Sequence, residues 1–309
     1  MRRSLLVMTL VAAVLVLGGS PAFAQASAPP ATWSVTDCQG CHEKALGPSF
    51  TQTKHATLDQ SCTKCHQSVG EHAKAQMAGE KGPVPSLKGM KASQINQTCL
   101  SCHEKDNQAS YLSSMHARRN VACTSCHSVH AAKSVKAQLK TKNDADTCYT
   151  CHKSERAKSM RTSHHPVREG KVGCASCHNP HDGSQPKMIK ADSVNELCYK
   201  CHTEKRGPFL FEHAPVREDC TTCHEPHGTN HKRLLQNKLP NLCWNCHLTG
   251  SGHFGSGDNL STEKGVPVAP TGAVSGYPTV NSRFVEKSCK NCHVNLHGSN
   301  SPSGAFFVR

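Results

Sequence analysis

Hydrophobic residues are concentrated in one segment of this chain, close to its N-terminus. Two arginines at positions 2 and 3 precede an apolar run over residues 5–17, and the triplet Ala-Phe-Ala ends at residue 24. This order is typical of a secretory signal peptide, so residues 1–24 are predicted to be removed by cleavage after Ala24. The alternative is an uncleaved anchor, although the run is shorter than the roughly 20 apolar residues that span a bilayer. No later stretch is apolar enough to cross a membrane as a helix.

The rest of the chain has too few apolar side chains for an ordinary core. Hydrophobic residues make up 36% of the sequence and aromatic residues 5%, and a chain of this kind would otherwise resemble a disordered one. Another apolar body must therefore fill the interior. We expect a mostly irregular chain with short α-helices, for example over residues 94–102 and 193–201, and little or no β-sheet. Residues 79–89 and 250–282, rich in Gly, indicate surface loops.

Cysteine and histidine are abundant, with 20 and 22 residues. All the cysteines fall into ten C-x-x-C pairs, each followed at once by histidine, which is the attachment motif of c-type haem. Two cysteines three apart form thioethers to one porphyrin, and the adjacent histidine meets the iron. We therefore predict ten covalently bound haem c groups. In chain order, motifs 1–10 are Cys38-Cys41-His42, Cys62-Cys65-His66, Cys99-Cys102-His103, Cys123-Cys126-His127, Cys148-Cys151-His152, Cys174-Cys177-His178, Cys198-Cys201-His202, Cys220-Cys223-His224, Cys243-Cys246-His247 and Cys289-Cys292-His293.

Two other uses of paired cysteines explain the pattern less well. Disulfide frameworks are common in secreted proteins, and tetrahedral zinc sites join C-x-x-C pairs in twos. Neither gives a reason for a histidine after every pair. Haem also accounts for the net charge, which is +14 for the whole chain and +12 without Arg2 and Arg3. Each ferric haem with two axial histidines carries about one negative charge, so we expect the basic residues to face propionates and solvent rather than nucleic acid.

Twelve histidines lie outside the motifs, and their spacing identifies ten candidate second axial ligands. One group precedes an even-numbered motif by seven or nine residues. A second group follows the histidine of an even-numbered motif by three to six residues, and one histidine of the last unit takes the slot of the first group. The ten are His55, His116, His165, His213, His253, His72, His130, His181, His227 and His297. This match predicts two axial histidines on every iron, whereas the methionines follow no comparable period.

Three assignments stay open at this point. His164 and His165 compete for one slot, and His231 has no assigned role. A histidine three residues after a motif histidine cannot easily pass around the porphyrin to the same iron. We therefore expect it to ligate a neighbouring haem, which would stitch successive haems into one row. Without methionine ligands the haems should have low reduction potentials. An iron with both axial positions filled changes oxidation state but binds no substrate.

The motifs repeat as five two-haem units of roughly 50 residues, in which each unit mainly contacts its neighbours. Units 1–5 contain motifs 1–2, 3–4, 5–6, 7–8 and 9–10. The recurring C-H-x-x-H, with Pro and Gly near it, and the C-terminal ending make the chain similar to a known family, the DmsE/MtrA group of decahaem cytochromes. These stretches read Cys223-His224-Glu225-Pro226-His227-Gly228 and His297-Gly298-Ser299-Asn300.

The resemblance covers essentially the whole chain after residue 24, and it implies both architecture and partners. It implies an elongated rod of two pentahaem halves, residues 25–155 with haems 1–5 and residues 156–309 with haems 6–10, in which haems replace a hydrophobic core. It also implies insertion from the periplasm into an outer-membrane β-barrel porin of the MtrB type. A periplasmic or inner-membrane cytochrome would be the donor, and an outer-surface multihaem cytochrome, a mineral or an exported reductase would be the acceptor.

Three functions therefore compete. The leading hypothesis is a conduit across the outer membrane without catalysis of its own. The second is a multihaem reductase for nitrite, hydroxylamine or a sulfur oxyanion, although no motif carries the lysine in place of histidine that marks many of these enzymes. The third is a free periplasmic shuttle without a barrel. The sequence does not encode the direction of electron flow, the potential of each haem or the end of the rod that faces outward.

Overall fold

The structure is a computed structural model that describes residues 33–44, 46–58, 61–105, 108–134, 137–247 and 288–308. The predicted signal peptide at 1–24, the predicted loop at 250–282 and the candidate ligand His253 lie outside these ranges.

Short helices joined by irregular segments form the described part of the chain. The longest, α4 and α5, have nine residues each. The α-helices are α1 Val35–His42, α2 Pro48–Thr51, α3 Ser61–Cys65, α4 Val69–Met77, α5 Ala92–Leu100, α6 Met115–Arg118, α7 Cys123–Cys126, α8 Asp144–Cys148, α9 Lys153–Ser159, α10 Cys174–Cys177, α11 Val194–Tyr199, α12 Ala214–Glu218 and α13 Asn241–Trp244. The 3₁₀ turns are η1 Lys54–Thr57, η3 Tyr111–Ser113, η4 Pro186–Met188, η5 Thr203–Lys205, η6 Cys220–Thr222, η7 Lys232–Leu234, η8 Cys289–Asn291 and η9 Gly304–Phe306.

The predicted fold class is confirmed. Within the described ranges the β-type pairing consists of isolated bridges, such as His127 with Leu139 and His224 with Leu235, and no strand forms. The two helices expected from the sequence are present as α5 and α11. Helix α11 begins there because the Ser193 hydroxyl accepts the backbone N–H of Glu196 at 3.1 Å, which satisfies one of the free donors at a helix start.

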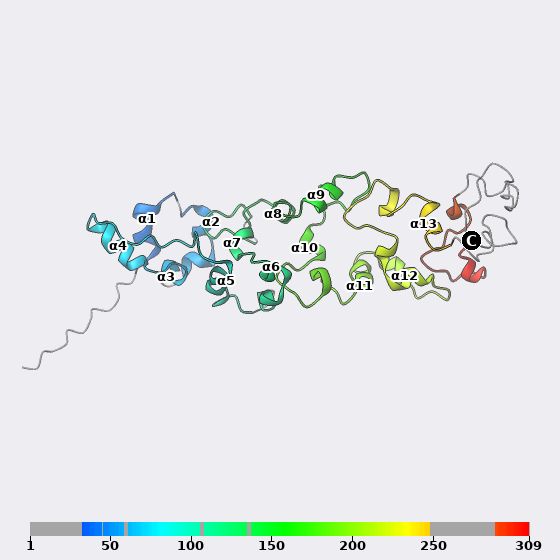
Figure 1. The fold of residues 1–309 in the computed structure, drawn as a ribbon, viewed down its shortest axis with the longest axis horizontal. Coiled ribbons are helices and arrows are strands. Elements are labelled where there is room, and N and C mark those ends of the chain that lie inside the picture. The colour runs from blue at the N-terminus through cyan, green and yellow to red at the C-terminus, as the bar shows by residue number, and fades with distance from the viewer. Residues whose placement is uncertain are drawn as a thin grey trace, which may run out of the picture.

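From one end of Figure 1 to the other the chain advances along the long axis, with local reversals such as α4, which lies beyond α1. Helices α1 and α4 lie at one end, α8 to α10 lie in the middle, and α12 and α13 lie near the other end with the C-terminus. The predicted border between the two halves, at residues 155 and 156, falls inside helix α9. Both the division into halves and its position stay predictions.

Buried apolar side chains are few and scattered. Seven hydrophobic residues of the described part are buried: six are spread between residues 46 and 145, and the seventh lies near the C-terminus. They are Leu46, Phe50, Ile95, Tyr111, Ala122, Ala145 and Phe307. A contiguous side-chain core of the usual kind is therefore not what holds these elements in place.

Buried asparagines connect the two motifs of units 2 and 4. In unit 2 the Asn96 side chain accepts the backbone N–H of Cys123 at 2.8 Å and donates to the Val121 carbonyl at 3.1 Å. In unit 4 Asn195 accepts the N–H of Cys220 at 2.7 Å and donates to the Val216 carbonyl at 2.9 Å. Each asparagine therefore fixes the start of an even-numbered motif against the helix that leads into the preceding odd-numbered one. The sequence patterns did not predict this pair of asparagines.

Candidate haem-binding sites

Every C-x-x-C-H motif folds as a single helical turn. Motif 1 lies inside α1. In each of the other nine, the backbone N–H of the motif histidine donates to the carbonyl of the first cysteine, at 2.9 to 3.0 Å. Because this bond closes one turn over five residues, both sulfurs and the imidazole project from the same short segment. The turn is the local geometry that two thioethers and one axial ligand on a single porphyrin require.

The cysteines form a series that follows the order of the chain. Within a unit the two first cysteines are neighbours, as shown by Cys38 and Cys62, whose sulfurs are 3.5 Å apart. Between units, the sulfur of Cys126 interacts with that of Cys151, and burial together with this neighbour raises the pKa of the Cys126 thiol. None of the twenty cysteines forms a disulfide. Consecutive motifs therefore present their attachment edges side by side along the molecule.

Nine motif histidines each face a histidine from outside the motifs. The ring centroids of these pairs are 5.8 to 6.3 Å apart. In order of motif number, the pairs are His42–His72, His66–His130, His103–His55, His127–His181, His152–His116, His178–His227, His202–His165, His224–His297 and His247–His213. The tenth motif histidine is His293, and the remaining candidate, His253, is outside the described ranges.

The spacing of these pairs fits one metal ion between two rings. A coordinating imidazole nitrogen lies about 2 Å from its metal and about 1 Å from its own ring centroid, so two imidazoles on opposite sides of a metal have centroids about 6 Å apart. Direct van der Waals stacking of two rings usually brings the centroids closer, beginning at about 4.5 Å. The histidine pairs of this chain therefore fit a haem iron, with the two cysteines of the same motif beside it.

The partners come from different units in eight of the nine pairs, and these eight follow two rules; the exception is His42–His72, which lies within unit 1. A histidine that follows an even-numbered motif faces the histidine of the preceding even-numbered motif, as His181 faces His127 at 5.9 Å. A histidine that precedes an even-numbered motif faces the histidine of the next odd-numbered motif, as His116 faces His152 at 6.1 Å. His130 also packs against unit 1, because its ring stacks on Phe50 with the centroids 5.3 Å apart.

The two adjacent histidines 164 and 165 have different surroundings. The His165 ring faces His202 with the centroids 6.3 Å apart. The ring of His164 instead uses both nitrogens within its own loop, with Nδ1 2.6 Å from the Arg161 carbonyl oxygen and Nε2 3.3 Å from Glu169. His231 lines a surface cavity together with Arg161 and other polar residues. The geometry therefore favours His165 over His164 as an axial ligand.

Backbone carbonyls orient many of the paired rings. Because a carbonyl oxygen only accepts, Nδ1 must carry the proton, which leaves the Nε2 lone pair for a metal. His116 donates to Pro180 at 3.0 Å and His165 donates to Pro226 at 2.8 Å. Each proline directly precedes the paired histidine of an adjacent site, so one dipeptide serves two neighbouring sites. The sequence patterns did not predict the role of these carbonyls, although the recurring Pro-His dipeptide could have indicated it.

Burial keeps several of these rings neutral. It lowers the pKa of His181 and of His213, with a smaller contribution from the ring that each faces. At the C-terminal end, burial and the nearby Lys205 lower the pKa of His297 to about 4. Only the neutral imidazole has a lone pair for iron, so burial favours the ligating form over the protonated one near neutral pH.

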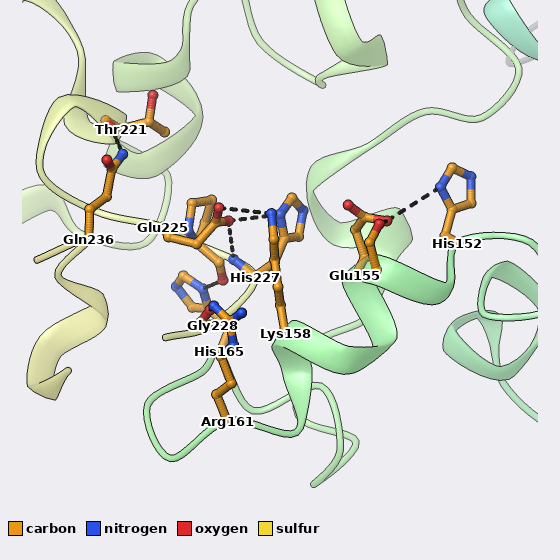
Figure 2. Close-up of polar contacts among 12 residues, drawn as sticks. His152, Glu155, Lys158, Arg161, His165, Thr221, Glu225, His227, Gly228 and Gln236 are labelled. Atoms are coloured by element: carbon orange, nitrogen blue, oxygen red, sulfur yellow. Dashed lines mark hydrogen bonds and ion pairs between the residues drawn. The ribbon is translucent and has the colours of Figure 1, made fainter. Parts of the chain in front are cut away.

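Helix α9 meets motif 8 in a cluster of charged groups, shown in Figure 2. Lys158 forms an ion pair with Glu225 at 3.0 Å, and the other carboxylate oxygen of Glu225 accepts the Nδ1 proton of His227 at 3.1 Å. Arg161 donates to the Gly228 carbonyl at 3.2 Å. Although burial raises the pKa of Glu225, the hydrogen bond from Lys158 and its positive charge leave that pKa below its ordinary value. Glu225 is therefore an ionised group in contact with a candidate ligand.

Two further properties of the described residues bear on function. No cluster of three or more His, Cys, Asp and Glu side chains in this part has a geometry suited to a bare metal ion. Among the same residues, no helix combines the length and the apolar character needed to span a membrane.

Comparison with known proteins gives consistent results. The family described as "Doubled CXXCH motif" matches residues 164–207 and 213–251, and the family "Cytochrome c-type protein NrfB-like" matches residues 62–146. The "Multiheme cytochrome MtrA" of Shewanella baltica (strain OS185) is 34% identical over 284 residues, which represent 88% of this chain and 80% of that protein.

Proposed function

The chain belongs to the MtrA family of multihaem c-type cytochromes, and from this premise we propose that it carries electrons across the outer membrane through a β-barrel partner. Family membership makes it an electron-transfer protein with covalently bound haem c. The proposal adds that all ten motifs carry haem, that every iron has two axial histidines, and that the haems form one continuous row. When bound, each haem exchanges one electron between its ferric and ferrous states.

The facing histidine pairs are the observation on which the proposal depends. We infer that each pair holds one iron, with the motif histidine on one side and its partner from another segment on the other. His253 is proposed to complete the site of His293 in the same way. Two strong axial ligands leave no open position for a substrate, which favours a carrier over a reductase.

The stitching of ligands between units supports a continuous row. Pro180 and His181 directly follow motif 6, yet the Pro180 carbonyl orients His116 and the His181 ring faces His127. This short segment therefore contributes to two successive proposed sites, those of motifs 4 and 5. Ligands shared in this way hold neighbouring haems at fixed spacing, which electron transfer in both directions requires. The direction of flow stays open.

Haem in place of a hydrophobic core is the second part of the proposal. The seven buried apolar side chains of the described part are dispersed, whereas motif histidines and their partners recur along the whole length. Ten porphyrins would supply the apolar area that the side chains lack. The elongated course of the ribbon in Figure 1 supports a rod, proposed to consist of two pentahaem halves that meet near α9.

Family membership supports a barrel partner and a periplasmic location. We propose a periplasmic protein that associates with the outer membrane through a porin of the MtrB type. A periplasmic or inner-membrane cytochrome would exchange electrons at one end and an outer-surface multihaem cytochrome or exported reductase at the other. An elongated row of haems suits passage through a narrow barrel.

Haem stoichiometry and spin state test the haem part of the proposal. Pyridine-haemochrome and iron analysis of the purified holoprotein should give ten haems per chain, and thiol reagents should detect no free cysteine. The ferric spectrum should be low-spin at every site, without a high-spin charge-transfer band. A count well below ten, or a substantial five-coordinate fraction, would refute it.

Reconstitution tests the conduit. Liposomes that contain the co-purified barrel complex and an entrapped multihaem acceptor should show reduction of that acceptor when dithionite is added outside. Liposomes with the barrel alone, or with this protein alone, are the controls and should show none. A holoprotein with ten low-spin haems that never co-purifies with a barrel and never supports this transfer would instead indicate the alternative function of a free periplasmic shuttle.

The NrfB-like match over residues 62–146 is also consistent with a free periplasmic shuttle, because it covers c-type motifs without implying any barrel. A multihaem reductase is the less favoured alternative. Turnover of nitrite, hydroxylamine or a sulfur oxyanion with a chemical donor would support it.

A further inference from the structure

One proposed axial ligand contacts a carboxylate rather than a carbonyl. The His227 ring, which faces His178 with the centroids 6.1 Å apart, has its Nδ1 3.1 Å from Glu225 Oε1. The same oxygen accepts the backbone N–H of His227 at 3.2 Å. The second oxygen of Glu225 is 3.0 Å from the ammonium group of Lys158. Both carboxylate oxygens are engaged, so the side chain is held in position beside the ring.

The corresponding positions of the other units carry no charge. Glu225 directly follows the histidine of motif 8, and the residues that follow the histidines of motifs 4, 6 and 10 are Ser128, Asn179 and Val294. At motif 6 the neutral Asn179 amide accepts the backbone N–H of His181 at 3.2 Å, as Glu225 does for His227. The local fold is therefore served equally well by a neutral side chain. The carboxylate at position 225 needs another explanation.

Neighbouring sites have neutral ring partners instead. The rings of His116 and His165, proposed ligands of the haems at motifs 5 and 7, donate to proline carbonyls at 3.0 and 2.8 Å. Two other acidic residues approach histidines of these motifs, but Glu155 and Glu204 lie 3.9 Å from the rings of His152 and His202, too far for a hydrogen bond. The Glu204 side chain is also 59% exposed, whereas that of Glu225 is 26% exposed.

A carboxylate on Nδ1 makes the imidazole a stronger electron donor to iron. The hydrogen bond draws the Nδ1 proton toward the negative oxygen, so Nε2 becomes more basic and stabilises ferric iron more than ferrous iron. Hydrogen bonds outside the ligand shell are among the means by which proteins set haem potential. A neutral carbonyl has the same effect to a smaller degree. The haem proposed to lie between His178 and His227 should therefore be harder to reduce than the haems of the neighbouring sites.

We propose that Glu225 is a positioning residue that lowers the reduction potential of the haem attached at Cys174 and Cys177 below those of the haems on either side. The inference rests on the proposed pairing of His227 with His178. It places an energetic step at the sixth of ten haems, where the two proposed pentahaem halves meet. Lys158 limits the effect by sharing the carboxylate. Electrons would occupy this haem after its two neighbours, so it separates the more easily reduced haems on either side of it.

Replacement of Glu225 tests the inference. In Glu225→Gln the amide oxygen still accepts the hydrogen bond but carries no charge. We expect about one-tenth of the haem absorbance in a spectroelectrochemical titration to move to higher potential. The expected shift is about tenfold in the ferric-to-ferrous equilibrium, or about 59 mV for one electron. The electron paramagnetic resonance signal of one low-spin haem should change with it. Glu218→Gln, at the exposed end of α12, makes the same charge change and should leave both unchanged.

Replacement of Glu225 by aspartate, which has a shorter side chain, distinguishes the effect of the hydrogen bond from the effect of the charge. Glu225→Asp keeps the charge but withdraws it from Nδ1, so it should also raise the potential of one haem. Parental potentials in Glu225→Asp, together with a shift in Glu225→Gln, would show an effect of charge alone and overturn the inference. Unchanged potentials in both variants would overturn it as well. If the parent protein itself lacks ten low-spin haems, the proposed function fails first, and that outcome is visible before any variant is made.

Discussion

Units 2 and 4 share an equivalent set of hydrogen bonds and differ in the charge beside the histidine of their even-numbered motif. In both, a buried asparagine connects the incoming helix to the even-numbered motif, and the motif histidine donates Nδ1 to a carbonyl nine or ten residues later: His127 to Ala137 at 2.7 Å and His224 to Arg233 at 2.8 Å. The residue after that histidine is Ser128 in one unit and Glu225 in the other. The comparison shows that the repeat fixes where the histidines lie, whereas single positions beside them set the local chemistry.

Removing a non-motif histidine should have the largest effect, because it takes one proposed axial ligand away from a haem. His130→Ala is expected to convert one haem from low-spin to high-spin, with a new charge-transfer band and carbon monoxide binding after reduction. We expect the affected haem to be the one at residues 62–66, because the His130 and His66 rings face each other with the centroids 5.8 Å apart.

Removing one haem-attachment motif in the same variant identifies the affected haem. Replacing both cysteines of the motif at 62–66 should abolish the high-spin signal of His130→Ala, whereas replacing those of the motif at 123–127 should leave it. The opposite pattern would mean that His130 serves the haem of its own motif. His227→Ala gives the matching test for a histidine of unit 4, and the affected haem should be the one at the motif 174–178 of unit 3.

A substitution in the backbone close to Glu225 should have the next largest effect, on the stability of the protein. Gly228 has a φ of +139°, and a Cβ there would lie 2.2 Å from the Lys158 carbonyl oxygen. Gly228→Ala should therefore destabilise the protein by on the order of 3 kcal/mol, from backbone strain and the displacement of α9. Chemical denaturation of the holoprotein measures this.

Gly47→Ala is the matched control, because Gly47 lies outside the haem-binding motifs, a Cβ there meets no atom within 4 Å, and its φ of −65° is one that alanine adopts. Alanine there should change the stability by about 0.5 kcal/mol or less. Equal losses at both glycines would show that the contact between Gly228 and α9 does not constrain the fold.

Replacing the buried asparagines should destabilise units 2 and 4 to a similar extent. Asn96→Ala and Asn195→Ala each leave the backbone N–H at the start of the motif without its acceptor. Asn195→Ala also removes the donor to the Val216 carbonyl, whereas after Asn96→Ala the Val121 carbonyl keeps the Tyr111 hydroxyl at 2.6 Å. We expect a loss of about 2 kcal/mol in each case, measured by denaturation at equal haem content. A large loss in one unit and none in the other would contradict the shared role. Asn179→Ala, beside the N–H of one histidine only, should cost less.

The smallest expected effect is on the pH dependence of stability. Burial and Lys205 lower the pKa of His297 to about 4 from 6.5, so between these values the unfolded chain binds a proton that the folded chain does not. Stability should be unaffected by this residue above about pH 6.5 and should fall as the pH drops toward 4. Iron ligation acts in the same direction, since it also requires the neutral ring.

His297→Asn tests the pH effect, because asparagine does not titrate in this range. The free energy of unfolding should then depend less steeply on pH between 6.5 and 4 than in the parent. An unchanged slope would show that His297 titrates alike in the folded and unfolded chains.

Much of this protein could be predicted from residue types and their spacing. The ten C-x-x-C-H motifs identify haem c, because the chemistry of attachment is local: one turn of five residues carries both thioethers and one ligand. The low apolar content correctly predicted a helix-poor chain. The helices α5 and α11 were expected because each leads directly into a motif. The signal peptide, the loop at 250–282, the division into halves and the ligand set stay predictions.

Only the tertiary structure decided how separate segments meet. Which histidine faces which motif depends on contacts between residues far apart in the chain, such as His224 and His297 with centroids 6.2 Å apart. The asparagine connections, the proline carbonyls and the contact between Glu225 and His227 were missed for the same reason. Sequence spacing fixes what one helical turn can reach, but the partner of a side chain depends on where the rest of the chain returns in space.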